Sequence, residues 1–467
     1  MMAGSVTAQT FTNLHSFSYG SDGAQPVAGL VLSGTNLYGT TDEGGTGNQG
    51  FIVGTGTVFV VGTNGMGLAT LQDFTPVFFG SNSDGAFPKA GLILAGNTLY
   101  GATSAGGSSD NGTVFAVSTN ASVFTNVYNF TATSGAASTN SDGAGPVAGL
   151  ILAGTNLYGA TRNGGYSGNG TVFALSTNGT GFTNLHSFSA TNGNGTNSDG
   201  AGPVAALVLS GTNLYGTAES GGGSGRGAVF AVSTNGLGFT NLHNFTGGSD
   251  GSDPVAGLTL SSNILYGTTT AGGSGGNGTV FAISINGTGF TNLHSFAATN
   301  NAGINSDGAV PSAGLVLSGD TLYGTAEQGG SSGNGTVFAV NIDGTGFTNL
   351  YSFTTTDDNG FNSDGANPLA GLILSGDILY GTSSAGGSSG YGTIFCLFLQ
   401  PQLTINRSGA EVILTWTNPA PGFTLQSTTN LPPTVWSNVS PAAIVVNGQN
   451  TVTNPISGAQ QFYRLSQ

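Results

Sequence analysis

The chain has 467 residues, of which 84 are glycine, and its 20 acidic and five basic residues give it a formal net charge of −15. Five basic residues cannot neutralise a nucleic-acid backbone or hold an anionic membrane surface, whereas metal cations and neutral glycans are compatible with this charge. No apolar run reaches transmembrane length, and the single cysteine, Cys396, excludes a disulfide framework. Because Cys396 lies in an apolar run, we expect it to be a small buried side chain.

The chain begins with MMAGSVTAQT, which lacks the charged and apolar regions of a secretory signal. It does contain Val6-Thr7-Ala8, which resembles the small-residue end of such a signal. We interpret residues 1–10 as the remnant of a signal peptide or, alternatively, as a solvated polar tail.

One segment of sequence occurs seven times in the chain, and its third copy is residues 141–188. Its marker, Leu-Tyr-Gly, recurs at intervals of 62, 58, 57, 51, 57 and 57 residues. A period this long indicates a unit of four strands, which needs neighbours on both sides to bury its apolar faces. The marker glycines are Gly39, Gly101, Gly159, Gly216, Gly267, Gly324 and Gly381.

Four strand signals follow one another in each copy. The first, PVAGLILA in the third copy, carries a pair of small residues that suits the strand closest to a crowded axis, and an apolar triplet that predicts burial on both faces. Leu-Tyr-Gly-Thr and Gly-Thr-Val-Phe-Ala-Val give the second and third strands. The fourth, Phe-Thr-Asn-Leu-His-Ser-Phe, is the most polar, as an outer edge should be.

The order of these strand signals along the chain predicts how the last repeat joins the first. The chain starts with a fourth strand at residues 11–17, and its seventh copy ends after the third strand at residues 393–399. The first segment therefore completes the seventh unit and removes an open sheet edge. We predict an all-β fold in which residues 11–399 form a seven-bladed β-propeller closed by the N-terminal strand; a solenoid would need capping repeats instead.

The repeat resembles the Gloeo/Verruco tandem repeat of secreted, choice-of-anchor bacterial proteins. The resemblance rests on GTVFALSTNGTGFTNLHSFS and SDGAGPVAGL and covers residues 11 to about 399. It implies an extracellular or cell-surface bacterial protein with a propeller-like region of unassigned activity and no catalytic residues to transfer. Members often end in a sorting or anchoring segment, and this chain ends differently.

The tail, residues 400–467, changes composition abruptly and holds both tryptophans, Trp416 and Trp436. Its phrases GFTLQSTTNL and QQFYRL resemble fibronectin-like modules at the C-termini of secreted bacterial proteins, so we predict a small β-sandwich. Its role is either surface association, secretion or stabilisation of the repeats. Short strands are predicted at residues 403–406, 411–416, 423–426, 444–446 and 462–465.

All four histidines fall at one position of the fourth strand, where the other copies have glutamine or tyrosine. Because the position accepts these three residue types, we interpret it as a half-buried structural slot and not as a metal ligand or general base. The residues at this position are His15, Gln72, Tyr128, His186, His243, His294 and Tyr351.

Each repeat also carries an aspartate that is followed by glycine and, four residues on, by proline. An aspartate that accepts backbone N–H groups is the ordinary way to fix such a turn. The alternative is that seven carboxylates on one face hold calcium, the one cofactor that the sequence leaves open. These residues are Asp22, Asp84, Asp142, Asp199, Asp250, Asp307 and Asp364.

Candidate ligand-binding residues lie where the copies differ. The connectors between repeats and the loops between second and third strands should emerge on one face, and the first copy has a longer loop that brings Phe51, Ile52 and Val53 into residues 48–54. These three side chains either mark an interaction patch or tuck back over the first blade. Charges that are not repeated also gather on this face: Asp42, Glu43, Arg162, Glu219, Arg226 and Glu327.

The sequence contains no nucleotide loop, zinc motif or nucleophile elbow. The leading hypothesis is a secreted, monomeric binding or scaffolding propeller that recognises extracellular carbohydrate or an envelope protein. A structural adhesive component and a polysaccharide-active lyase or hydrolase are the alternatives. Paired carboxylates for glycoside chemistry would need a defined separation across a cleft, which a sequence cannot show.

Overall fold

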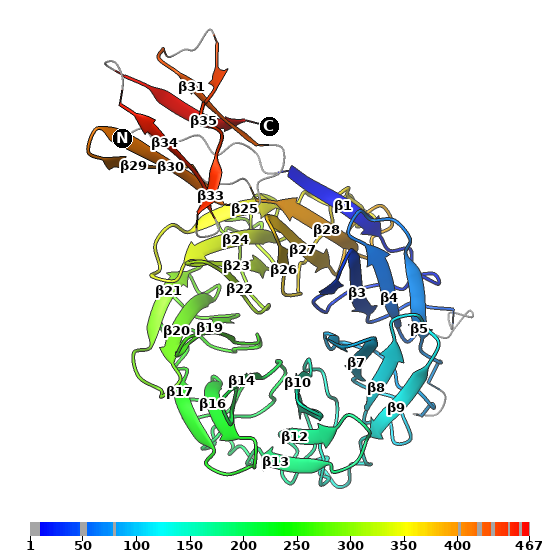
Figure 1. Cartoon of the computed structure of the whole chain (residues 1–467). Helices are drawn as coiled ribbons and strands as arrows, with labels where there is room; N and C mark the ends of the chain where they lie inside the picture. Colours follow the sequence, from blue (N-terminus) through cyan, green and yellow to red (C-terminus); the bar gives the residue numbers. More distant parts are fainter. Residues whose placement is uncertain are drawn as a thin grey trace. The chain divides into compact units, whose positions relative to one another are not determined.

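The computed structural model describes residues 10–46, 54–77, 81–399, 403–417, 423–430, 435–446, 449–456 and 460–466 (Figure 1). Every helix or strand assigned in these ranges is a β-strand, so the described part of the chain has no helix that could cross a membrane. The chain divides into two compact units. The larger comprises Thr12–Ile373 and Tyr380–Cys396, and the smaller includes the chain from Leu397 onward.

The predicted unit of four strands is confirmed in every repeat. Six sheets consist of four consecutive strands, and within each of them neighbouring strands run antiparallel, as in β10-β11-β12-β13. The remaining sheet has the order β1-β28-β27-β26, so it combines the first strand of the chain with three strands of the seventh repeat. In Figure 1 the strands of the larger unit stand around a common centre, with β10, β14, β22 and β26 on the inside.

The first strands are only three residues long, shorter than the predicted stretch. They are β2 (Val31–Ser33), β6 (Ile93–Ala95), β10 (Ile151–Ala153), β14 (Val208–Ser210), β18 (Thr259–Ser261), β22 (Val316–Ser318) and β26 (Ile373–Ser375). The second strands are β3 (Asn36–Thr41), β7 (Thr98–Thr103), β11 (Asn156–Thr161), β15 (Asn213–Ala218), β19 (Ile264–Thr269), β23 (Thr321–Ala326) and β27 (Ile378–Ser383).

The third strands hold the most buried residues of each repeat. They are β4 (Thr57–Gly62), β8 (Thr113–Ser118), β12 (Thr171–Ser176), β16 (Ala228–Ser233), β20 (Thr279–Ser284), β24 (Thr336–Asn341) and β28 (Thr393–Phe398). The fourth strands are β1 (Thr10–Ser16), β5 (Ala69–Asp73), β9 (Phe124–Asn129), β13 (Thr183–Ser187), β17 (Thr240–Asn244), β21 (Thr291–Ser295) and β25 (Thr348–Ser352).

The marker glycine is required by close packing inside the sheet. Gly159 of β11 is the register partner of Phe173 in β12. A Cβ atom on Gly159 would lie 2.6 Å from Phe173 Cζ and 2.8 Å from Leu150 Cδ2, closer than side chains tolerate. The same close approach recurs at the other six marker glycines, so the Leu-Tyr-Gly motif leaves room for the phenylalanine ring of the third strand.

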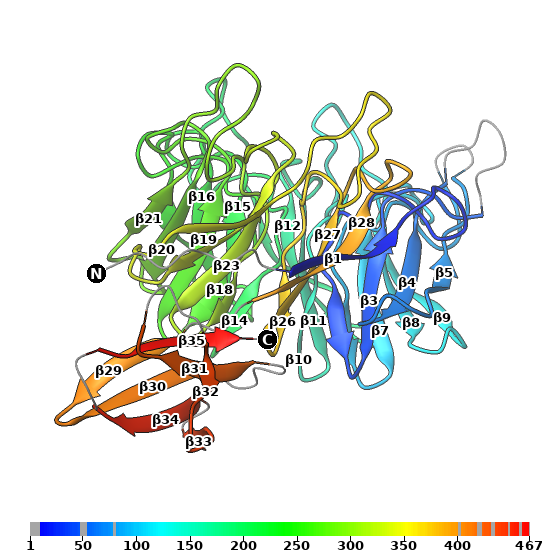
Figure 2. The ribbon, with the colours of Figure 1, turned by 90° about the horizontal axis from the view of Figure 1, so that it is seen from above.

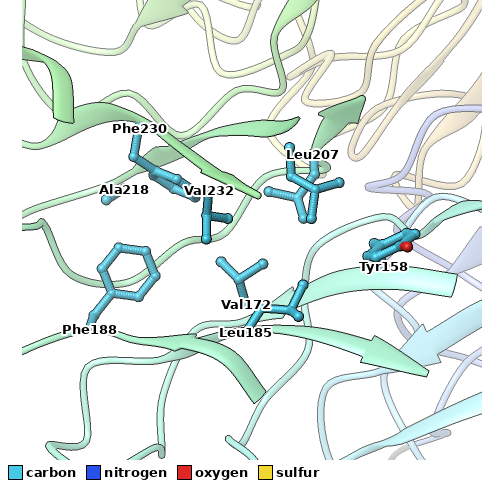
Figure 3. Packing of buried hydrophobic residues seen from close by; sticks show 9 residues of the cluster. Tyr158, Val172, Leu185, Phe188, Leu207, Ala218, Phe230 and Val232 are labelled. Carbon is cyan, nitrogen blue, oxygen red and sulfur yellow. The ribbon is translucent and has the colours of Figure 1, made fainter. Parts of the chain in front are cut away.

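Successive sheets are joined by phenylalanine rings. Phe188, which follows β13, lies edge-on to Phe230 of β16 with 5.3 Å between ring centroids. Around this pair, Val172 and Leu185 of the third sheet pack against Leu207 and further residues of the fourth, as Figure 3 shows. Burial of these aromatic and aliphatic side chains between the sheets supplies the hydrophobic stabilisation that a single sheet lacks.

A backbone hydrogen bond also ties each sheet to the next. The N–H of Gly145 donates to the carbonyl of Asn111 at 3.0 Å, and the N–H of Gln25 donates to the carbonyl of Tyr391 at 2.9 Å. The residue that donates this bond precedes a proline and has a positive φ in all seven repeats, even where it is Phe87 (57°) or Val310 (58°). Such residues rarely adopt this conformation, so the junction imposes it on them.

The inner segments line a central cavity of about 290 Å³. Its wall is built from a glycine or alanine and a leucine in each repeat, such as Gly149 and Leu150. A Cβ atom on Gly29 would lie 3.3 Å from the carbonyl oxygen of Gly371, which belongs to the seventh repeat. Small residues therefore do lie next to the crowded centre, but they precede the innermost strand and are not part of it.

The smaller unit contains two sheets, with the orders β29-β30-β34-β33 and β32-β31-β35. Leu414, Trp416 and Val452 of the first sheet and Leu425 of the second form its buried cluster. The polar segments β32 and β34 were not predicted from the sequence. The strands are β29 (Thr404–Ser408), β30 (Glu411–Thr417), β31 (Thr424–Thr428), β32 (Ser437–Asn438), β33 (Ile444–Val446), β34 (Gln449–Pro455) and β35 (Phe462–Ser466).

Candidate functional site

The connectors between repeats and the loops between second and third strands meet in every repeat, and we call the surface that they form the loop face. In the third repeat an isolated bridge joins Ala144 of the connector to Asn163 of the loop, and the other six repeats have an equivalent bridge. Figure 2 shows long loops projecting from one side of the larger unit. The repeat-specific residues of both loop classes therefore share a surface.

Each of the seven aspartates accepts hydrogen bonds from the fourth strand that precedes it in the chain and from the residues just after that strand. Asp142 Oδ2 accepts the hydroxyl of Tyr128 at 2.8 Å and the N–H of Thr131 at 2.9 Å, and Asp142 Oδ1 accepts the hydroxyl of Thr131. In the other repeats the fourth-strand donor is histidine, glutamine or tyrosine, as in His186 Nε2, which lies 2.9 Å from Asp199 Oδ2. This shared acceptor explains why one position takes all three residue types.

These contacts lower the pKa of Asp22, Asp199 and Asp250. Burial alone would raise the pKa of Asp199, but hydrogen bonds from His186 and Ser189 outweigh it and lower the pKa below its ordinary value. The carboxylate oxygens thus face N–H and O–H donors. Among the residues that the structure describes, no three His, Cys, Asp or Glu side chains come together as possible metal ligands.

The charged candidates form separate pairs on the loop face. Arg162 Nη2 of the third repeat lies 3.2 Å from Glu219 Oε2 of the fourth. Arg226, another of the candidates, is exposed, and its carbonyl accepts the N–H of Asp253. Exposed pairs of this kind contribute little stability.

Asp42 pairs with a residue that the sequence analysis did not single out. Its Oδ2 atom lies 3.4 Å from Nζ of Lys89, the only lysine of the chain. Burial raises the pKa of Asp42, although Lys89 opposes this effect. Burial likewise raises the pKa of Glu327. Phe51, Ile52 and Val53, with the rest of residues 48–53, lie outside the described residues.

A groove that was not predicted from the sequence lies on the loop face beside the seventh sheet. It encloses about 500 Å³ and brings together the connector that follows the sixth sheet and the loop between β27 and β28. Two aromatic side chains in its wall, Phe361 and Tyr391, are 40% and 39% exposed. The groove is lined by Asn359, Phe361, Ser388, Ser389, Gly390 and Tyr391.

Tyr391 departs from the repeat. Four other copies have asparagine at this position, and the remaining two have Thr55 and Arg226. The ring of Tyr391 packs on that of Tyr19 with 4.9 Å between centroids. Burial, followed by the negative charge of Glu43, raises the pKa of Tyr19. The loss of the repeat's asparagine was the signal available in the sequence.

Comparison with curated proteins finds no match. Among solved structures, the chain is similar to the GH74 enzyme from Niastella koreensis, with 14% identity, 98% of this chain and 72% of that chain covered, and a TM-score of 0.50. TolB from Acinetobacter baumannii has 12% identity, 62% and 58% coverage and a TM-score of 0.36. An oligogalacturonate lyase in complex with manganese has 11% identity, 85% and 98% coverage and a TM-score of 0.46.

The first of these likenesses concerns the fold alone, which is propeller-like and all-β. A family model, the Gloeobacter/Verrucomicrobia repeat, matches residues 3–141, 78–197, 137–306 and 300–412. These matches cover the whole repeat region and most of the chain. The chain therefore belongs to the Gloeobacter/Verrucomicrobia repeat family.

Proposed function

We propose that this protein is a secreted or cell-surface binding module that holds extracellular carbohydrate in the groove of Phe361 and Tyr391. The observation that carries the proposal is the pair of half-exposed aromatic side chains in a wall otherwise made of serine, asparagine and glycine. Isolated exposed aromatic residues are common, but two that share one concave polar site are typical of a ligand pocket.

The chemistry of this wall suits a sugar. A pyranose ring has an apolar face of C–H groups, which packs on an aromatic ring, and a rim of hydroxyls, which need hydrogen-bond partners. Phe361 and Tyr391 supply aromatic surface, while Ser388, Ser389 and Asn359 supply hydroxyl and amide groups. A volume of about 500 Å³ lies in the range of small-molecule sites, so it suits one or two sugar units.

We also propose that the larger unit is a seven-bladed propeller closed by β1 and that it serves as the rigid support of this groove. Two kinds of contact support closure: the bond from Gln25 to the carbonyl of Tyr391 and the contact of Phe17 with Phe59. Both have equivalents between successive sheets elsewhere in the unit. Loops on such a scaffold can vary without disturbing the core.

The test replaces Tyr391 with asparagine, the residue found at this position in four other repeats. Tyr391→Asn should weaken binding to a panel of soluble polysaccharides by about tenfold or more, which corresponds to ~1.4 kcal/mol. Arg226→Asn, which makes the equivalent change in the fourth repeat, is the matched control and should leave binding unchanged. Affinity electrophoresis and calorimetry measure both, and thermal melting checks the fold.

Unchanged binding by a folded Tyr391→Asn variant would move the site elsewhere. If the protein binds envelope proteins but no polysaccharide, its partner is a protein and not a carbohydrate.

A further inference from the structure

We infer that the groove selects uncharged saccharides and rejects polyanionic ones; this inference rests on the proposed carbohydrate-binding function. It comes from the charges around the groove and not from its aromatic wall. Carboxylates stand on both flanks, and basic side chains are absent from the segments that build it.

One flank is the connector that presents Phe361. Asp357 Oδ1 accepts the N–H groups of Asn359 at 2.9 Å and of Phe361 at 2.8 Å. This turn fixes the backbone at the groove and places a carboxylate beside it. The next residue, Asp358, is exposed and directly precedes Asn359, which lines the groove. Two acidic residues therefore adjoin the lining residues in sequence and in the turn.

The other flank is the pair of Tyr19 and Glu43. Tyr19 packs on Tyr391, and the nearby Glu43 carboxylate contributes to raising the pKa of the Tyr19 hydroxyl. Glu43 therefore adds a third carboxylate close to the aromatic wall. A sugar hydroxyl can donate to such an acceptor, whereas a uronate carboxylate cannot.

No basic residue compensates for these carboxylates. The segments that build the groove and its flanks, residues 17–30, 354–368 and 384–392, contain no lysine, arginine or histidine. Lys89 is already paired with Asp42, the residue before Glu43, and elsewhere on the loop face Arg162 is paired with Glu219. An anionic sugar entering the groove would lose hydration and gain no counter-charge, while an uncharged sugar avoids this cost.

The experiment compares polysaccharides that differ only in charge. Each neutral polysaccharide of the binding panel is paired with its carboxymethylated or oxidised derivative, and methyl-esterified polygalacturonate is paired with the de-esterified polymer. We expect the wild-type protein to bind the neutral member of a pair at least about tenfold more tightly at low salt, with the difference shrinking at high salt because screening weakens repulsion.

Asp358→Asn should narrow this difference by strengthening binding of the charged member. Asp343→Asn is the matched control: it removes the same charge from the turn between β24 and β25, where five other repeats have asparagine and where Asp343 Oδ1 accepts the N–H of Thr345. The control should leave the ratio of the affinities for the neutral and the charged member unchanged.

Equal binding of both members by the wild-type protein, or equal effects of Asp358→Asn and Asp343→Asn, would overturn the selectivity while leaving carbohydrate binding in place. Failure to bind any member would overturn the proposed function and the selectivity with it.

Discussion

The ring of Phe17 lies 5.4 Å from the ring of Phe59, at an interplanar angle of 61°. Phe17 follows β1, which completes the sheet of the seventh repeat, and Phe59 belongs to β4 in the sheet of the first repeat. The pair Phe245 and Phe281, which joins the fourth sheet to the fifth, has almost the same geometry, at 5.3 Å and 64°. The contact that joins the last repeat to the first is therefore equivalent to an internal one.

Replacing Phe17 with alanine tests this equivalence. Phe17 is fully buried, so the truncation leaves a cavity and should lower the free energy of unfolding by about 3–5 kcal/mol. Phe245→Ala, at the internal junction, should cost a similar amount. Urea unfolding followed by circular dichroism measures the free energy of unfolding of both variants. A much smaller loss for Phe17→Ala than for Phe245→Ala would contradict closure by β1.

The fifth repeat contains a defect that a single substitution should repair. Six repeats have serine or threonine two residues after the fourth strand, and its hydroxyl donates to the aspartate Oδ1, as Ser18 does to Asp22 at 2.6 Å. The fifth has Ala297, and Asp307 Oδ1 is buried without a hydrogen-bond partner among the described residues. Ala297→Thr should raise the free energy of unfolding by about 1 kcal/mol.

The control for this prediction is Ala298→Thr, which adds the same side chain one residue further along. Thermal melting compares the two variants. No gain for Ala297→Thr, or an equal gain for both, would show that the buried oxygen carries no penalty.

Stability should fall in two steps as the solution becomes acidic. Burial lowers the pKa of His243 below its ordinary 6.5 more than Asp250 raises it, so below pH 6.5 protons bind preferentially to the unfolded chain. The pKa values of Asp22, Asp199 and Asp250 are lowered below 3.8 because the hydrogen bonds they accept outweigh burial. Their stabilisation is complete above pH 3.8 and is lost as the pH falls through the folded values.

Urea unfolding between pH 8 and pH 3 measures both steps. His243→Gln, which introduces the residue found in the first repeat as Gln72, should remove the contribution of His243 to the upper step and leave the lower one. A free energy of unfolding that rises from pH 7 to pH 5 would contradict the first assignment.

Calcium should leave the melting temperature unchanged. Apart from Asp307 Oδ1, the oxygens of these aspartates already accept N–H and O–H donors, as Asp142 does from Tyr128 and Thr131, and a cation would have to displace them. Melting with millimolar calcium and with a chelator checks this, with magnesium as the control. A rise specific to calcium would restore the alternative in which the aspartates hold the ion.

The sequence predicted the sheets well and the groove poorly, for one physical reason. Strand and turn positions repeat, so the close contact of Gly159 with Phe173 leaves its mark in every copy. The groove depends on Phe361 and Tyr391, which stand on different connections and meet only when the chain is folded. Arg162 and Glu219 were named from the sequence as candidates on one face, but their ion pair was not predicted, although both occupy the same position of adjacent repeats.

Two further misses have local causes. The strand β34 carries asparagine and threonine with little apolar alternation, so its pattern did not indicate a strand. The partner of the fourth-strand histidines was overlooked, although an aspartate follows at a similar place in every repeat. Histidine, glutamine and tyrosine look unrelated at this position until one considers that each can donate a hydrogen bond.

The pairing of β1 with β28 also sets the timing of folding during synthesis. Asn13 donates to the carbonyl of Ser363, so β1 can make this contact only after 350 further residues have been synthesised. At about 5–20 residues per second this amounts to roughly 20–70 s. During that interval six sheets can assemble in order while their two outermost edges stay open to other chains. The nascent protein is therefore most prone to aggregation just before its last repeat leaves the ribosome.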